Sequence, residues 1–222
     1  MRVFAFCVAV ALCAACGQSA PPGPPASGEA AEPSRPARTA EVKPADVIRV
    51  RSELPPGFEV ADLSGGVAPL ALWGFGAQWV ADPPQCGVLA DPAGDGVVHG
   101  FSASGPGGIV YAVVAEAATE FDPSSTDSCG TWTLTGGRTS GTVTLVGPPT
   151  VEGAATLGMA TDATTVVEGG TETHSHADTF IAYLGTHVAY VAVVTDPGSS
   201  APALGPDVAA DLLVKTVSAV RG

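Results

Sequence analysis

Apolar segments with period-two alternation, joined by short glycine-containing turns, make up most of the chain after residue 96. Residues 97–104 and 108–115 flank one such turn, 131–135 and 141–146 a second, and 180–184 and 187–194 a third. This pattern is typical of β-hairpins. Residues 154–161 and 164–167 lie on either side of Thr161-Asp-Ala163 and predict a further hairpin. The chain is therefore expected to fold mainly as an antiparallel sheet.

Three segments outside these hairpins predict helices. Residues 44–54 begin with a proline suited to a first helical turn and end before Pro55-Pro56-Gly57, and residues 83–89 predict one short helix. Residues 206–222 place apolar side chains on one helical face. Hairpins closed by terminal helices predict an α+β fold, a twisted antiparallel sheet covered on one face by the N- and C-terminal helices.

The first 43 residues are not expected to belong to this domain. Arg2 and the short apolar run after it are typical of a secretory signal, which we place at residues 1–15. Ala14-Ala15-Cys16-Gly17 resembles the bacterial lipobox, although Cys13 stands where that pattern prefers leucine. The resemblance implies that Cys16 is lipidated, with acyl chains such as palmitate, and holds the protein at the extracytoplasmic face of the cell membrane. An ordinary cleaved signal that leaves Cys16 as a free thiol is the alternative.

A tether and one globular domain follow the predicted lipidation site. Residues 16–43 are rich in proline and alanine and have almost no apolar surface to bury, so we expect a tether, and a single domain at 44–222. The chain has no asparagine and only two lysines, a bias that fits the high-GC genome of an actinobacterium.

The charge of the domain limits its partners. From residue 53 to 222 three basic residues oppose eighteen carboxylates, a net charge of −15. Such a domain is repelled by phosphate backbones and anionic headgroups, which argues against nucleic-acid binding and against lying flat on a membrane. The expected partners are a small molecule, lipid, glycan or envelope protein, besides the membrane itself through the anchor. An acidic surface that only keeps an exported protein soluble is the simpler interpretation.

Cys86 and Cys129 are the remaining cysteines of the predicted mature domain. An exported chain sits in an oxidising compartment, so we expect them to form a structural disulfide.

Several motifs together resemble a mycobacterial lipoprotein family of unknown function. Besides the lipobox, tether and C-terminal helix, they are Leu54-Pro-Pro-Gly57, Asp82-Pro-Pro-Gln-Cys86, Cys129-Gly-Thr-Trp132 and Gly169-Gly-Thr-Glu-Thr-His-Ser-His176. That family is similar in layout to the extracellular sensor domain of PknH-type receptor kinases. The resemblance implies an antiparallel sheet with helices and a cleft, and ligand binding without catalysis. The sensor pattern has a second disulfide, which this chain cannot form.

The densest polar cluster is Glu172-Thr-His174-Ser-His176-Ala-Asp178. In an extended segment Glu172, His174, His176 and Asp178 share one face. Two imidazoles with a carboxylate can bind zinc. A polar strand facing solvent is the alternative, and a pH-sensitive contact is another.

Trp73, Phe75 and Trp79 lie in an aromatic, glycine-rich stretch. Aromatic side chains spaced by small residues can form the floor of a ligand pocket, or they can be core residues at a bend.

We therefore expect a non-catalytic, sensor-like lipoprotein domain that needs no cofactor. A metal-dependent hydrolase that uses the His174 and His176 strand is one alternative, and a structural envelope protein is another. Convergence of His99 or His187 on that strand would favour the hydrolase.

Overall fold

The computed structural model describes residues 41–63, 67–94 and 96–222. The predicted signal, Cys16 and most of the predicted tether lie outside these residues. All of these described residues belong to one compact unit. None of the helices within the described ranges has the length and apolar character needed to cross a membrane.

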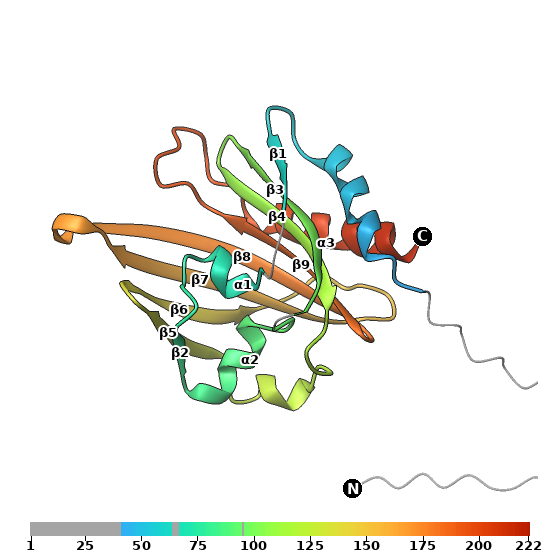
Figure 1. The fold of residues 1–222 in the computed structure, drawn as a ribbon, viewed down its shortest axis with the longest axis horizontal. Helices are drawn as coiled ribbons and strands as arrows, with labels where there is room; N and C mark the ends of the chain where they lie inside the picture. Colours follow the sequence, from blue (N-terminus) through green and yellow to red (C-terminus); the bar gives the residue numbers. More distant parts are fainter. Residues whose placement is uncertain (1–40, 64–66, 95) are drawn as a thin grey trace, which may run out of the picture. The chain divides into compact units, whose positions relative to one another are not determined.

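The domain is built on one antiparallel sheet of nine strands in the order β1-β3-β4-β9-β8-β7-β6-β5-β2 (Figure 1). Its strands are β1 (Glu59–Asp62), β2 (Trp79–Asp82), β3 (Val98–Gly105), β4 (Gly108–Glu116), β5 (Thr131–Gly136), β6 (Thr139–Val146), β7 (Ala155–Val166), β8 (Glu172–Leu184) and β9 (His187–Val194). Strands β5 to β9 form a continuous meander, and β4 pairs with β9. The predicted α+β fold is confirmed.

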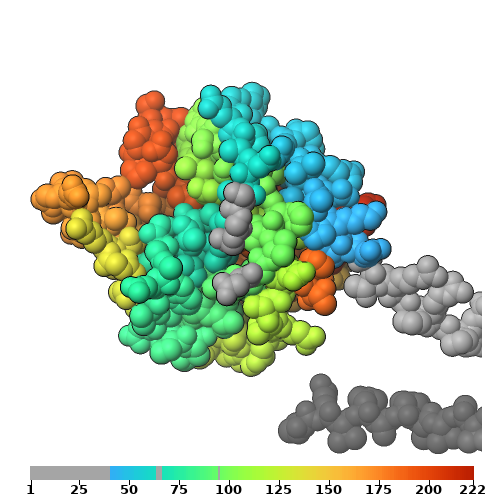
Figure 2. All heavy atoms as spheres, in the orientation of Figure 1, coloured from blue at the N-terminus to red at the C-terminus, as the bar shows by residue number. Residues whose placement is uncertain are grey.

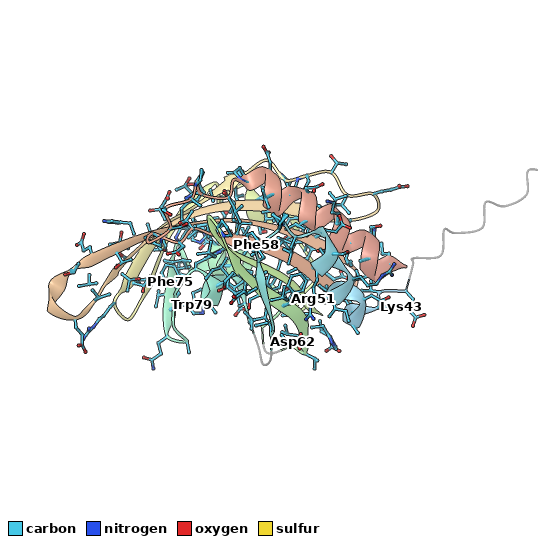
Figure 3. The ribbon with its side chains drawn as sticks, turned by 90° about the horizontal axis from the view of Figure 1, so that it is seen from above. Lys43, Arg51, Phe58, Asp62, Phe75 and Trp79 are labelled. Atoms are coloured by element: carbon cyan, nitrogen blue, oxygen red, sulfur yellow. A yellow bond between two sulfur atoms is a disulfide. The ribbon has the colours of Figure 1, made fainter. Side chains whose placement is uncertain are left out.

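One face of the sheet is covered by the two terminal helices, as predicted. These are the 3₁₀ helix η1 (Pro44–Glu53) and α3 (Pro206–Arg221), which pack against each other and against the central strands (Figure 3). The buried face of α3 consists of Ala209, Leu212, Leu213, Thr216, Val217 and Val220. Arg51 of η1 pairs with Asp62 of β1, and its guanidinium lies over the Phe101 ring, 5.3 Å from the centroid. The backbone N–H of Lys43 donates to the carbonyl of Val220 at 2.8 Å, so the domain begins and ends at one place.

The other face carries a second apolar core under short segments. These segments are α1 (Pro69–Leu72), η2 (Pro84–Cys86), α2 (Gly87–Ala90) and η3 (Pro123–Thr126). A disulfide joins Cys86 to Cys129, both fully buried, and ties η2 to the start of β5. The predicted disulfide is therefore present, and the predicted helix at 83–89 corresponds to η2 and α2 together.

The predicted hairpin at 154–167 is wrong. Residues 155–166 form the single strand β7, in which every residue pairs with β8. Thr161, Asp162 and Ala163 can all adopt extended backbone, whereas Gly169 and Gly170 take φ of +86° and +81°. The turn therefore falls at η4 (Glu168–Gly170), where glycine allows the left-handed conformation. The resulting hairpin of β7 and β8 projects at the left of Figures 1 and 2.

Candidate functional site

Strands β5 and β6 have one apolar and one hydroxyl-bearing face. On β5, Trp132 and Leu134 are buried, while Thr131, Thr133 and Thr135 between them are exposed. On β6, Ser140, Thr142 and Thr144 are exposed in the same way. Period-two alternation puts these hydroxyls on the side of the sheet away from the apolar core under α1 and α2.

The strand register aligns these hydroxyls with the polar cluster of β8. Thr133, Thr142, Asp162 and His176 lie opposite one another across β5 to β8, and Thr135, Ser140, Thr164 and His174 form the next row. All of these residues except His176 line an open groove of about 580 Å³. The hydroxyl groove, as we call it, is lined by Thr133, Leu134, Thr135, Ser140, Gly141, Thr142, Asp162, Ala163, Thr164, His174 and Ser175.

His176 lies at one margin of the groove between two carboxylates. Its Nδ1 is 2.8 Å from Asp162 Oδ1, and its Nε2 is 3.4 Å from Asp178 Oδ1. Burial of the ring lowers the pKa of His176, but the hydrogen bonds and negative charges of Asp162 and Asp178 together raise it above its usual value. A neutral imidazole has a single N–H, so only the protonated ring can donate to both carboxylates.

His174 contacts a hydroxyl instead. Its Nδ1 is 3.0 Å from Thr164 Oγ1 on the neighbouring strand. Asp162 is exposed and uses Oδ1 for the contact with His176. The groove therefore presents hydroxyl groups together with one carboxylate and one imidazole.

The four residues predicted to bind zinc lie on one face of β8 but do not converge on one point. His174 contacts Thr164, and His176 contacts Asp162 and Asp178. Within residues 41–63, 67–94 and 96–222, no group of three or more His, Cys, Asp or Glu side chains is placed to hold a metal ion. The reason is that β7 supplies partners to both imidazoles.

The other two histidines lie away from this cluster along the sheet. His187 pairs with Leu184 at the far end of β8 from His174. His99 pairs with Val114, which pairs in turn with Ala189 near the start of β9. The convergence that would favour a hydrolase is not observed.

The predicted aromatic pocket residues lie beside the second core. Trp73 and Phe75 are 2% and 4% exposed and pack inside that core, and the partly buried Trp79 packs against it. Trp73 Nε1 donates to Thr179 Oγ1 at 2.9 Å. Figure 3 shows Phe75 and Trp79 on the side of the sheet away from α3. The core interpretation of Trp73 and Phe75 is thus the one that the structure supports.

A smaller cavity of about 230 Å³ lies between α2 and the segment that leads into η3. Its walls include Leu89 and Pro92 on one side and Phe121 on the other, next to Tyr183 of β8. The rings of Phe121 and Tyr183 stack with centroids 4.5 Å apart, and burial raises the pKa of Tyr183 to about 12. The cavity is small for a drug-sized ligand.

Most of the groove was not predicted from the sequence. His174 and His176 were candidate site residues, but Asp162, Thr133 and Thr142 were not. The signal was present in Thr131-Trp-Thr-Leu-Thr135, where large apolar residues alternate with threonine. Asp162 was assigned to a turn, and this error concealed its position beside His176.

Comparison with solved structures found similar chains, of which the first described here supports the fold. An uncharacterized protein from Mycobacterium smegmatis, an Rv0999 ortholog, superposes with a TM-score of 0.62 at 21% identity, over 82% of this chain and 98% of that chain. The extracellular domain of PknH from Mycobacterium tuberculosis gives a TM-score of 0.45 at 15% identity, over 82% and 92% of the two chains. A search of curated proteins found no match.

A family model covers nearly the whole described domain. It is the model of DUF5642, a domain of unknown function, and it matches residues 43–221. Its first and last matched residues lie within three positions of the start of η1 and the end of α3. The chain therefore belongs to the DUF5642 family.

Proposed function

We propose that this protein is a lipoprotein of the outer face of the cell membrane, and that its domain binds a ligand without transforming it. The observation that carries the proposal is the hydroxyl groove, an open concavity of about 580 Å³ on strands β5 to β8. Concave sites with a few convergent polar groups are the usual place for ligands in proteins.

The arrangement of polar groups in the groove favours binding over catalysis. An acid–base triad needs a hydroxyl, an imidazole and a carboxylate in series. Here the hydroxyl of Thr164 contacts His174, whereas Asp162 and Asp178 contact His176. The three functional groups are divided between two imidazoles, so neither imidazole has both partners.

The proposed membrane anchor rests on the sequence around Cys16. The lipobox-like residues precede a proline-rich stretch that would hold the domain away from the bilayer. The net charge of −15 after residue 52 opposes contact with anionic headgroups, so attachment would depend on the lipid. Cys16→Ala should move the protein from the membrane fraction to the soluble or unprocessed pool. Full membrane retention of a correctly cleaved variant would contradict the anchor.

Binding can be tested on the full-length protein with a solubilised extract of the envelope of its own cell. Wild type and the triple variant Thr133→Val, Thr135→Val, Thr142→Val are incubated with the extract, recovered and analysed by mass spectrometry for bound compounds. We expect to recover from the wild type a compound that has the same mass as in the extract. The triple variant should yield much less of this compound. A compound released with an altered mass would indicate an enzyme, and no groove-dependent compound at all would overturn the proposal.

A further inference from the structure

We infer that the hydroxyl groove takes an uncharged, polyhydroxylated ligand, a saccharide chain. This inference rests on the proposed binding function and assigns the chemical class of the ligand.

The hydrogen-bonding groups of the groove match those of a sugar. Thr133, Thr135, Ser140, Thr142 and Thr164 each contribute a hydroxyl, which both donates and accepts hydrogen bonds. A sugar hydroxyl also donates and accepts, so hydroxyls of the ligand and of the groove can form hydrogen bonds with each other in several arrangements. Asp162 adds an acceptor, because the described contact with His176 uses only its Oδ1. Carboxylates accept hydrogen bonds more strongly than neutral oxygens do, so Asp162 can accept hydrogen bonds from neighbouring hydroxyls of a sugar.

The charges around the groove exclude anionic ligands. The groove lining contains no lysine or arginine. Residues 53–222 carry eighteen carboxylates against three basic side chains. A phosphate or carboxylate ligand would meet an unfavourable potential and would find no guanidinium or ammonium group among the lining residues. The nearest basic residue along the chain, Arg138, lies in the turn between β5 and β6 and is not part of the lining. The carboxylate of Asp162 already has the imidazole of His176 as a partner, so the groove does not demand a cationic ligand either.

The apolar side chains of the same strands face the other way, which excludes an acyl chain. Trp132, Leu134 and Val143 belong to the core on the opposite side of the sheet. The side chains that face the groove offer methyl groups of threonine but no larger aliphatic or aromatic surface. Threonine methyls can contact the C–H groups of a sugar ring, whereas an alkyl chain needs a continuous apolar wall.

The spacing and rigidity of the hydroxyls favour an elongated ligand. Neighbouring strands lie about 4.8 Å apart, so the rows that cross β5 to β8 extend over about 14 Å. Threonine is β-branched and has few χ1 rotamers, so its hydroxyl loses little freedom when a ligand binds. A row of this length accommodates several linked rings and is longer than a monosaccharide.

The test uses the full-length protein and linear hexasaccharides of glucose, mannose, galactose and arabinose as probes, with binding measured by calorimetry. We expect at least one of them to bind, and the triple variant Thr133→Val, Thr135→Val, Thr142→Val to bind it at least about tenfold more weakly, since each lost hydroxyl removes a hydrogen bond. Valine keeps the shape and strand preference of threonine, so the fold should persist. Thr173→Val is the matched control, because Thr173 is an exposed residue of β8 that lies on the opposite face to His174.

A second arm uses the envelope extract after periodate oxidation and borohydride reduction, which destroy vicinal diols. Loss of the groove-dependent compound after this treatment, with retention in an extract treated with borohydride alone, would support a saccharide. Retention of the compound after periodate would overturn the saccharide assignment and leave the binding function standing. If no hexasaccharide bound and the untreated extract gave no groove-dependent compound, both the saccharide assignment and the proposed binding function would be overturned. If Thr173→Val weakened ligand binding as much as the triple change does, the assignment of the hydroxyl groove as the binding site would be overturned.

Discussion

The indole of Trp73 and the hydroxyl of Thr179 form a buried hydrogen bond that joins the C-cap residue of α1 to strand β8 across 106 residues of sequence. Trp73 is 2% exposed and Thr179 is fully buried. A buried hydroxyl that loses its partner retains the cost of leaving water.

Trp73→Phe should therefore destabilise the domain by about 1–3 kcal/mol, through the lost hydrogen bond and the smaller ring. In a double-mutant cycle with Thr179→Val, we expect a coupling energy of about 1 kcal/mol from equilibrium urea unfolding. Additive effects of the two changes would show that the bond contributes nothing to stability.

Reduction of the Cys86–Cys129 disulfide should lower stability without changing the fold. The two residues are 43 apart in sequence, and closing a loop of this length stabilises the native state by about 4 kcal/mol in the chain-entropy model. Cys86→Ala with Cys129→Ala should lower the urea midpoint accordingly. The far-ultraviolet circular dichroism spectrum below the transition should match that of wild type. Equal midpoints for wild type and the double variant would contradict this prediction.

Gly158 of β7 is expected to tolerate no side chain. A Cβ at this position would lie 2.8 Å from the carbonyl oxygen of Val146 and 2.8 Å from the ring of Phe180. Gly158→Ala should cost about 1–3 kcal/mol, because overpacking forces shifts of the backbone. Gly130→Ala is the control, since nothing lies within 4 Å of its Cβ position. A Gly158→Ala variant as stable as the Gly130→Ala variant would refute the close approach.

The protonation of His176 should make stability depend on pH. Its pKa is raised in the folded state, because the contacts with Asp162 and Asp178 outweigh the effect of burial. Protonated His176 therefore adds its full contribution to the free energy of unfolding when the pH is below the ordinary pKa of 6.5. This contribution is lost as the pH rises through the raised pKa of the folded state.

The melting temperatures of wild type and His176→Gln should therefore differ more at about pH 5.5 than at about pH 8.5. His99→Gln is a suitable control, since His99 is exposed and has no carboxylate contact in the described residues. The same difference between wild type and His176→Gln at both pH values would show that the pair of carboxylates does not hold the proton.

The fold was predictable where local pattern and tertiary structure agree. The buried face of α3 and the hairpins closed at Gly107 and Gly185 follow from periodicity and from glycines with positive φ. The edge strands β1 and β2 were missed, because each has only four residues and the residues of β1 are all exposed. Such strands exist through pairing with β3 and β5, and this pairing leaves no periodicity in their own sequence.

The candidate site was less predictable, because it depends on strand register. The sequence places Glu172, His174, His176 and Asp178 on one face, and the structure agrees. Which neighbours meet that face is decided by β7, which brings Asp162 to His176 and Thr164 to His174. A shift of one residue in this register would have put both partners on the opposite face, and the sequence alone does not fix it.

The hydrogen bond between Lys43 and Val220 gives the domain nearly coincident ends. A short linker from Gly222 to Glu41 could then close the chain into a ring. New ends could be opened between Gly147 and Pro148, two exposed residues of the connection that follows β6. Such a circular permutant should retain both cores and the hydroxyl groove. The order in which the strands leave the ribosome would then differ from their order in the natural chain, and the proposed anchor could be attached at the connection after β6 instead of before η1.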